Sequence, residues 1–272
     1  MADKRPIGVF DSGLGGLTVV KEMIKELPNE NIVYFGDTGR VPYGTRSVET
    51  IRKYTLQDEK FLLNNDVKLI VAACGTVSSV AADTALQLPV PFFEVVSHAS
   101  KSAVNATKNG KIGVIGTNAT VKSQQHKKHI QKIMPNAEVL TCSCPLFVPL
   151  VEEGWYSADD LVVTETVERY LKPIMEFGAD TIILGCTHYP VLSEAIKKVV
   201  GNDITLINAG TSTAFAVKEF LEENSIQNDT SNAFHKFYVS DKPDSFRYQA
   251  SVLLGKDFDE TFVQEVDINN LW

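Results

Sequence analysis

Residues 68–79 read KLIVAACGTVSS and residues 180–190 read DTIILGCTHYP, so two short apolar runs each lead into a cysteine, Cys74 and Cys186. A β-branched run of this length predicts a buried parallel strand, and the small residues after it predict a turn into a helix. Each sulfur is then expected at the carboxyl end of a strand, the edge where open α/β sheets bind ligands. Because the positive end of the following helix favours thiolate, we expect a lowered pKa for both thiols.

Other landmarks repeat in the same order as the two cysteines. The segment IGVF at residues 7–10 recurs as IGVI at 112–115, and Pro-Asn at 28–29 recurs at 135–136. These repeats share an offset of roughly 110 residues, which predicts two related halves that arose by duplication. Two equivalent thiols in such halves suggest that protons are transferred from two sides of one bound molecule.

The composition is that of a globular protein able to bury a sizeable core, with 272 residues of which 44% are hydrophobic and 22% charged. The net charge of −8, with both signs interspersed, argues against a nucleic-acid partner. No apolar run reaches the length of a signal peptide or a membrane span, so we expect a cytoplasmic protein with no membrane partner. Four cysteines do not resemble a disulfide framework, which leaves reduced thiols available for chemistry.

Apolar runs alternate with amphipathic stretches along the chain, which is the βαβα pattern of parallel sheets. Strands are expected at 6–10, 32–36, 68–73, 90–96, 111–115, 137–141, 180–184 and 204–207. Helices are expected at 15–27, 47–64, 77–87, 119–133, 158–177, 190–200 and 211–223, followed by a loop over 222–232, a strand and a helix. The predicted fold class is therefore α/β.

Duplication favours two pseudo-symmetric lobes, each a mainly parallel sheet flanked by helices. Residues 1–97 and 209–272 are expected to form the first lobe, and residues 98–208 the second. Connections near 97 and 209 would then form a hinge. The active site is expected in the cleft between the lobes, which is where small molecules bind in such architectures.

The segment DSGLGG at residues 11–16 follows the first strand and opens a helix, an arrangement that can cradle an anion. It matches a dinucleotide fingerprint only in part, because Thr18 stands where the third glycine is needed. A nucleotide-binding protein is therefore the alternative from a different functional class. Helix capping by Asp11 and Ser12 explains the same residues without a nucleotide.

Two further segments lie at the same predicted edge of the sheets. Turn chemistry explains the composition of GDTGRVPYG at 36–44, although Arg40 and Tyr43 could reach a ligand from this loop. His188 follows Cys186 by two residues, and an imidazole beside a thiol stabilises the thiolate or relays a proton. We therefore interpret His188 as a catalytic residue.

Cys142 and Cys144 form a C-x-C pair followed by Pro145. No further His or Cys pair completes a zinc-ligand pattern, so we expect no metal site. The two residues are interpreted as small buried hydrophobic side chains.

Six motifs, in this order along the chain, resemble those of the bacterial glutamate racemases: DSGLGGLTV, YFGDTGRVPYG, VAACGTVSS, IGVIGTNATVKS, CPLFVPLVEEG and LGCTHYP. The resemblance covers residues 6–210 and weakens beyond them. It implies an isomerase that interconverts L-glutamate and D-glutamate without a cofactor and supplies D-glutamate for peptidoglycan, and hence for cell-wall biogenesis and cell shape. The resemblance implies glutamate as the small-molecule partner, and it is compatible with a homodimer because some family members are dimers.

The resemblance also implies roles for individual residues. Cys74 and Cys186 would flank the Cα atom, with Cys74 deprotonating D-glutamate and Cys186 deprotonating L-glutamate. Asp11 would stabilise the substrate ammonium group and assist Cys74, and His188 would assist Cys186. The implied substrate-binding groups are Asp11, Ser12, Tyr43, Thr76, Thr187, His188 and the backbone amides of Gly44 and Gly75, while Asp37 and Glu152 match acidic residues of lesser role.

The chain departs from the family pattern in two places. Many members have Asn where this chain has Gly75, so only the backbone amide can serve there. Residues 97–100 read SHAS where Pro-Gly is frequent, which bears on the expected hinge. An aspartate racemase is the alternative within the same superfamily, although its second cysteine is typically followed by Thr-Glu rather than by Thr187 and His188.

Overall fold

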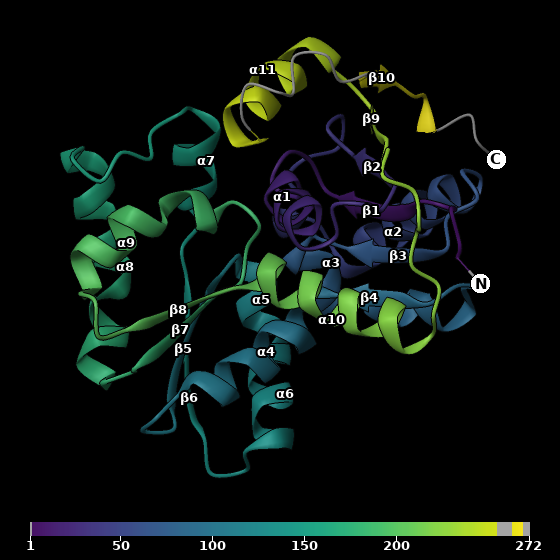
Figure 1. Cartoon of the computed structure of the whole chain (residues 1–272). Helices are drawn as coiled ribbons and strands as arrows, with labels where there is room; N and C mark the ends of the chain where they lie inside the picture. Colours follow the sequence, from purple (N-terminus) through teal and green to yellow (C-terminus); the bar gives the residue numbers. More distant parts are fainter. Residues whose placement is uncertain (1, 255–262, 269–272) are drawn as a thin grey trace.

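The computed structural model describes residues 2–254 and 263–268, which form two parallel sheets flanked by helices (Figure 1). The first sheet has the order β10-β9-β2-β1-β3-β4 and the second β6-β5-β7-β8. The strands of the first sheet are β1 (Ile7–Asp11), β2 (Ile32–Gly36), β3 (Leu69–Ala72), β4 (Phe92–Glu94), β9 (His235–Val239) and β10 (Val263–Glu265). Those of the second are β5 (Lys111–Gly116), β6 (Glu138–Ser143), β7 (Thr181–Leu184) and β8 (Thr205–Asn208).

The two sheets repeat one topology. The order β2-β1-β3-β4 in the first corresponds strand by strand to β6-β5-β7-β8 in the second, and every described pair is parallel. Val9 on β1 pairs with Tyr34 and Val71, as Val114 on β5 pairs with Thr141 and Ile183. The predicted α/β class with two pseudo-symmetric lobes is confirmed.

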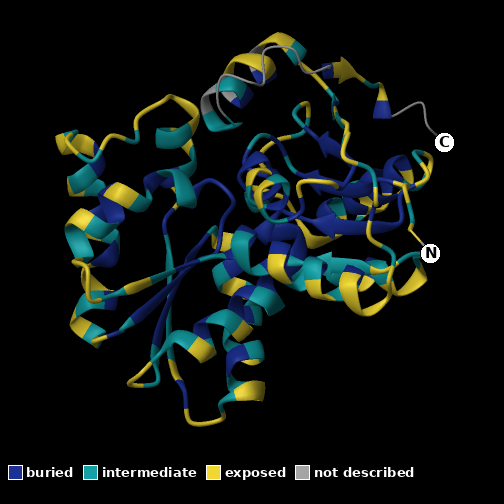
Figure 2. Cartoon of the chain, in the orientation of Figure 1, coloured by how far each residue is buried: buried dark blue, intermediate teal, exposed yellow. Residues whose placement is uncertain are grey.

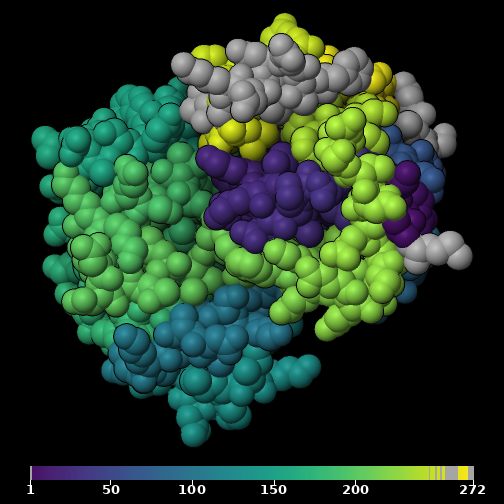
Figure 3. Space-filling model, viewed as in Figure 1, coloured from purple at the N-terminus to yellow at the C-terminus, as the bar shows by residue number. Residues whose placement is uncertain are grey.

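Helices cover both faces of each sheet. They are α1 (Leu17–Glu26), α2 (Val48–Leu63), α3 (Gly75–Val80), α4 (Val95–Ala106), α5 (Asn118–Ser123), α6 (Gln125–Ile133), α7 (Phe147–Glu152), α8 (Leu161–Phe177), α9 (Ser193–Val200), α10 (Ala209–Glu223) and α11 (Pro243–Leu254). The described residues also form the 3-10 turns η1 (Tyr43–Thr45), η2 (Ala82–Gln87) and η3 (Tyr189–Leu192). In Figure 3 the purple surface that includes α1 is bordered on several sides by yellow-green atoms, in agreement with the packing of α1 against α10 and α11.

One apolar core joins the two sheets. It runs from Val9 and Val71 in the first sheet through Val20 and Val217 on helices α1 and α10 to Ile183 in the second sheet. The central strands β1, β2, β3, β5 and β7 are buried, while many residues on the outer faces of the helices are exposed (Figure 2). Because α4 and α10 pack in this shared core, the carboxyl ends of β3 and β7 are held close to each other.

The structure corrects the expectation of a strand over 90–96 followed by a connection. The strand ends at Glu94, whose carboxylate caps α4 by accepting hydrogen bonds from the amides of Val96 at 2.6 Å and Ser97 at 2.8 Å. Such a cap satisfies helix amides that otherwise have no partner, so the helix begins at Val95 and continues to Ala106. Residues 97–100 therefore lie within a helix.

Other differences from the expected elements are local. The helix expected at 119–133 is divided at Gln124, where φ is 56°, and the helix expected at 77–87 ends at Val80 and continues as η2. Helix α7 and strand β10 were not expected from the sequence, whereas β9 and α11 follow the 222–232 loop as expected. Within the described ranges, the helices all fall short of the length and apolarity that a membrane crossing requires.

Candidate active site

A cavity of about 280 Å³ lies where the carboxyl ends of the two sheets meet, and both Cys74 and Cys186 line it. This volume is close to the lower limit for small-molecule sites. The other lining residues are Ser12, Gly13, Val41, Pro42, Tyr43, Gly44, Thr45, Gly75, Thr76, Thr117, Pro145, Val148, Pro149, Glu152, Thr187, His188 and Tyr189. Every predicted site residue except Asp11 is in this set. Within the described part of the chain, the lining contains no Lys or Arg.

The turns after the two cysteine strands touch each other. A Cβ atom added at Gly75 would lie 2.4 Å from the carbonyl oxygen of Gly185 and 3.7 Å from Cys186 Cα. The first of these distances is too short for a real carbon, so a side chain at position 75 would push the two turns apart. The departure at Gly75 thus permits a backbone contact between the two lobes.

Cys74 is a buried thiol, and its pKa is raised rather than lowered as the sequence predicted. The residue caps α3, and its Sγ lies 3.5 Å from Ser12 Oγ. Burial and the negative charge of Asp11 raise the pKa of Cys74 to about 12, against smaller opposing effects from Ser12 and the amide of Val77. The expectation of a lowered pKa from the helix end is wrong here, because desolvation of the thiolate outweighs the field of a one-turn helix.

Asp11 lies behind the cavity wall. Its side chain is fully buried, its Oδ2 accepts a hydrogen bond from the Gly13 amide at 2.9 Å, and its Oδ1 lies 3.5 Å from Thr187 Oγ1 of the other lobe. Burial raises the pKa of Asp11, while the positive charge of His188 and the backbone hydrogen bonds oppose this change. Asp11 is therefore placed to act on the site through its charge.

Cys186 is joined to a chain of polar groups. His188 Nδ1 lies 3.8 Å from Cys186 Sγ, and His188 Nε2 lies 3.1 Å from Glu152 Oε1 on α7. Burial alone would lower the pKa of His188, but the hydrogen bonds and charges of Cys186 and Glu152 outweigh it and raise this pKa to about 10. The imidazole is consequently protonated at neutral pH, and Glu152 is its counter-ion.

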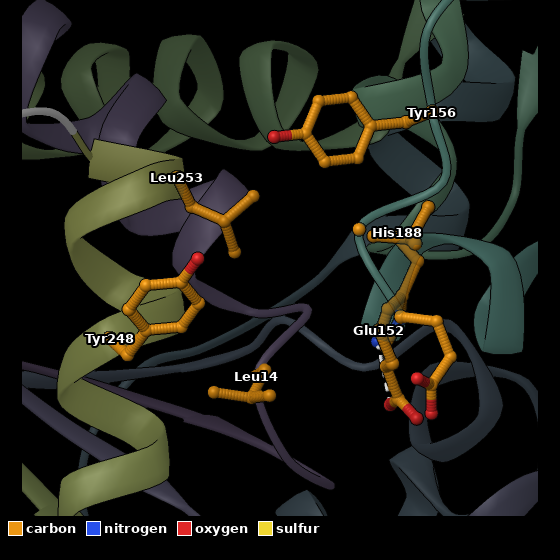
Figure 4. A pocket seen from close by; sticks show the side chains of 9 residues that line it. Leu14, Glu152, Tyr156, His188, Tyr248 and Leu253 are labelled. Atoms are coloured by element: carbon orange, nitrogen blue, oxygen red, sulfur yellow. Dashed lines mark hydrogen bonds and ion pairs between the residues drawn. The ribbon is translucent and has the colours of Figure 1, made fainter. Parts of the chain in front are cut away.

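Figure 4 shows His188 and Glu152 in a second cavity, of about 390 Å³, where Tyr248 and Leu253 on α11 face them from the opposite wall. His188 and Glu152 line both cavities and stand between them.

The glycine-rich segment is packed against site residues of its own lobe and of the other lobe. A Cβ added at Gly15 would lie 2.2 Å from Thr187 Oγ1, and one at Gly16 would lie 2.5 Å from Asp11 Cβ. Thr18 Oγ1 also donates a hydrogen bond of 2.8 Å to the Thr187 carbonyl. The glycines thus permit close packing between lobes, which does not favour the nucleotide alternative.

Thr117 is a cavity residue that the sequence analysis missed. Its Oγ1 lies 3.1 Å from Thr76 Oγ1 and 3.0 Å from Thr120 Oγ1, and a Cβ added at Gly44 would lie 3.2 Å from Thr117 Cβ. Thr117 directly follows β5, the counterpart of β1, so the duplication itself was a signal that it would lie beside Ser12 at the cavity.

Metal ligation finds no support in the described ranges, which contain no group of three His, Cys, Asp or Glu side chains able to hold an ion. Cys144 is fully buried, as expected, whereas Cys142 is only partly buried on β6, with its Sγ 3.2 Å from the Tyr170 carbonyl.

The model of the Asp/Glu/hydantoin racemase family matches residues 7–217, which is most of the chain. The chain belongs to this family. Its relatives include a glutamate racemase from Geobacter metallireducens, which is 44% identical over 253 residues covering 92% of this chain and 93% of the relative.

Two solved structures of this racemase family extend the similarity to the whole fold. The glutamate racemase of Francisella tularensis, crystallised in complex with D-glutamate, has a TM-score of 0.91 and 38% identity, covering 98% of this chain and 99% of its own. The glutamate racemase of Thermus thermophilus has a TM-score of 0.88 and 39% identity, covering 100% of both chains. The resemblance stated from the six motifs is confirmed.

Proposed function

We propose that this protein interconverts L-glutamate and D-glutamate by moving the Cα proton between Cys74 and Cys186. The observation that carries the proposal is that the two sulfurs end equivalent strands of two pseudo-symmetric lobes and line one cavity. Family membership and the D-glutamate complex of the Francisella relative support the choice of reaction and substrate.

Inversion of a carbon centre requires a proton to leave one face and another to arrive at the opposite face. With L-glutamate, the Cys186 thiolate takes the Cα proton, so the C–H bond breaks and an S–H bond forms. The Cys74 thiol then gives its proton to the other face of the carbanion, and with D-glutamate the two sulfurs exchange roles. No cofactor is required in this scheme, because the protein stabilises the carbanion by placement and electrostatics.

The form of the enzyme that binds L-glutamate carries the transferable proton on Cys74. A thiol whose pKa is raised to about 12 remains protonated near neutral pH. Protonated His188 balances the charge on the Cys186 side, and Asp11 attracts the substrate ammonium group through the cavity wall. Asp11 and His188 thereby assist Cys74 and Cys186 respectively.

Neutral donors hold the two carboxylates of the substrate. They are the hydroxyls of Ser12, Thr76, Thr117 and Thr187 and the backbone amides of Gly44 and Gly75. Tyr43 contributes a wall, since its own hydroxyl is bonded to Asp37 and Asp58. Hydroxyl donors bind a carboxylate without adding a fixed positive charge beside the reacting thiols.

We also propose that residues 1–97 with 209–272 form one lobe and residues 98–208 the other, with α4 crossing from the first to the second. Residues 255–262 and 269–272 of the first lobe lie outside the described residues. The product D-glutamate would supply peptidoglycan synthesis in the cytoplasm.

The direct test offers the purified protein L-glutamate and L-aspartate separately and follows the loss of circular dichroism of each amino acid. We expect the circular dichroism signal to decay to zero in the glutamate sample and to stay constant in the aspartate sample. Decay with aspartate alone would assign the aspartate racemase activity instead, and no decay with either would refute the proposal. In deuterated water, early deuterium should appear in the product and little in the recovered substrate.

A further inference from the structure

The loop that carries Tyr43 and Gly44 to the cavity is anchored by a buried polar cluster. We use the name anchor cluster for Asp37, Arg40, Tyr43 and Asp58, which come from the end of β2, the following loop, η1 and α2. The side chains of both aspartates are fully buried, and Tyr43 is 1% exposed. The cluster therefore lies out of solvent directly behind the cavity wall.

The hydroxyl of Tyr43 contacts both carboxyl groups. It is hydrogen-bonded to Asp37 Oδ2 and lies 3.1 Å from Asp58 Oδ2. A phenol carries one proton, so it can donate to only one of these oxygens. The second contact is a favourable hydrogen bond only when that carboxyl group carries a proton of its own and donates it to the phenol oxygen.

The other hydrogen bonds show which carboxyl group is protonated. Asp37 accepts from Arg40 Nε at 2.6 Å and from Ser240 Oγ at 2.7 Å, in addition to Tyr43. Asp58 has a single longer contact to the guanidinium, 3.3 Å from Arg40 Nη2. The guanidinium of Arg40 thus neutralises Asp37, and the proton belongs on Asp58.

We propose that Asp58 is a neutral, protonated carboxyl group that donates a hydrogen bond to Tyr43 and so positions the 37–45 loop at the cavity. Asp58 does not line the cavity, so it is a positioning residue. The kinetic part of this inference rests on the proposed function, because it assigns substrate binding to the wall formed by Tyr43 and Gly44.

The electrostatic environment agrees with this assignment. Burial raises the pKa of Asp58 well above its usual range, the charge of Asp37 raises it further, and Arg40 and the hydrogen bond of Tyr43 oppose them. Glu59, the next residue on α2, also raises it slightly. Arg40 is held in place by its contact with the face of the Tyr54 ring, 4.0 Å from the ring centre.

The kinetic test compares Asp58→Asn with Asp58→Leu. The amide of Asn can donate to Tyr43 and accept from Arg40, whereas Leu has a similar branched shape, a larger volume and no hydrogen bonds. We expect Asp58→Leu to raise KM for both glutamate enantiomers about tenfold with a smaller change in kcat, and Asp58→Asn to recover KM to within about threefold. Equal damage in both variants, or no change in Asp58→Leu, would overturn the inference.

Glu59→Gln is the matched control. Glu59 is a buried carboxyl group on the same helix, but it accepts its hydrogen bond from Thr84 at 2.6 Å rather than from the anchor cluster. We expect its KM values to match those of the unaltered protein, and a rise equal to that of Asp58→Leu would overturn a specific role for Asp58. If Asp58→Leu does not fold, Tyr43→Phe replaces it, because it removes the same hydrogen bond and should raise KM similarly.

An infrared measurement tests the protonation without any substrate. At pH 8 we expect the unaltered protein to show the C=O stretch of a protonated carboxyl group that is missing in Asp58→Asn. Glu59, whose pKa burial raises to about 7, is mostly ionised at this pH, so Glu59→Gln should keep the band. A spectrum identical in Asp58→Asn and the unaltered protein would overturn the inference, even if glutamate proved not to be the substrate.

Discussion

The half of the cavity around Cys74 and the half around Cys186 share a topology but differ in charge. Each cysteine follows the equivalent strand, β3 or β7, of its sheet. Behind Cys74 lies the carboxyl group of Asp11, whereas beside Cys186 lies the protonated imidazole of His188. The repeated topology therefore fixes where the sulfurs lie, and the residues around them give the two sulfurs different electrostatic surroundings.

This asymmetry has a thermodynamic limit. The two enantiomers of glutamate have equal free energy in solution, so kcat/KM must be the same in both directions for any variant. A difference between the two halves can therefore appear as kcat and KM values that differ between the two enantiomers by the same factor. It can also appear in a property measured on one sulfur at a time, such as its rate of proton exchange or alkylation.

The largest effect is expected from removing either sulfur. Cys74→Ala and Cys186→Ala should each lower the turnover of both enantiomers by about 10³-fold or more, because in each variant one face of Cα lacks its acid or base. Slow deuterium exchange at Cα should persist only on the enantiomer served by the remaining sulfur, which is L-glutamate for Cys74→Ala and D-glutamate for Cys186→Ala. Nuclear magnetic resonance of the Cα proton measures both rates.

Cys142→Ser is the control for this experiment, since Cys142 lies on β6 outside the cavity and should retain normal turnover. Exchange on the same enantiomer in both alanine variants would contradict the placement of one sulfur on each face.

The next effect tests the contact between the halves. Gly75→Ala adds a carbon 2.4 Å from the Gly185 carbonyl oxygen, so the two cysteine turns must separate. We expect turnover to fall by about 10- to 100-fold in both directions, because proton transfer depends on the positions of the donor and acceptor atoms.

The matched control is Gly210→Ala, whose added carbon would lie 3.1 Å from Val19 Cα outside the cavity. Equal turnover losses in the two glycine variants would show that tight packing in general, rather than the cysteine contact, limits the reaction.

A smaller effect concerns stability on the Cys186 side. The pKa of His188 is about 10 in the folded protein, above the usual value of about 6.5, so protonation stabilises the folded state. This stabilisation is complete below about pH 6.5 and is lost as the pH rises towards 10. Denaturant unfolding should show the advantage over His188→Asn shrinking by up to about 1.4 kcal/mol per pH unit between these limits.

Glu152→Gln provides the comparison for that measurement. It removes one of the charges that raise the pKa of His188, so the same loss of stability should begin at lower pH. A difference from His188→Asn that grows with pH would contradict a protonated His188.

The smallest effect concerns the Cys74 side. Asp11→Asn removes a negative charge that raises the pKa of Cys74, so more thiolate should be present at pH 8 to 9. Alkylation of Cys74 should become about threefold faster, and only this much, because burial is the larger cause and remains. Mass spectrometry of the labelled peptides, with Cys186 as the internal reference, measures the change. An unchanged or slower rate would show that Asp11 does not act on Cys74.

Much of the fold followed from local patterns. The apolar runs at β1, β2, β3, β5 and β7 were recognisable because fully buried parallel strands have no alternation. Helix α4 was missed because its start depends on the Glu94 carboxylate and its sequence, VVSHASKS, lacks a strong helical pattern. His98 on this helix stacks on the ring of Phe93, with centroids 5.6 Å apart.

The candidate site divides in the same way. Residues that follow β1, β3 and β7, such as Ser12, Thr76 and Thr187, could be found because strand ends of parallel sheets share one edge. The partnership of Glu152 with His188 could not, because α7 reaches the cavity only through the packing of the second lobe.

The sequence by itself determined that two strands end in cysteines, that the halves repeat and that the chain resembles a racemase family, because these depend on neighbouring residues and their order. Only the tertiary structure decided the protonation of Cys74, the burial of Asp11 and the anchoring of Tyr43 by Asp58. Desolvation and charge act through space between residues far apart in the chain, so their effects appear only after folding.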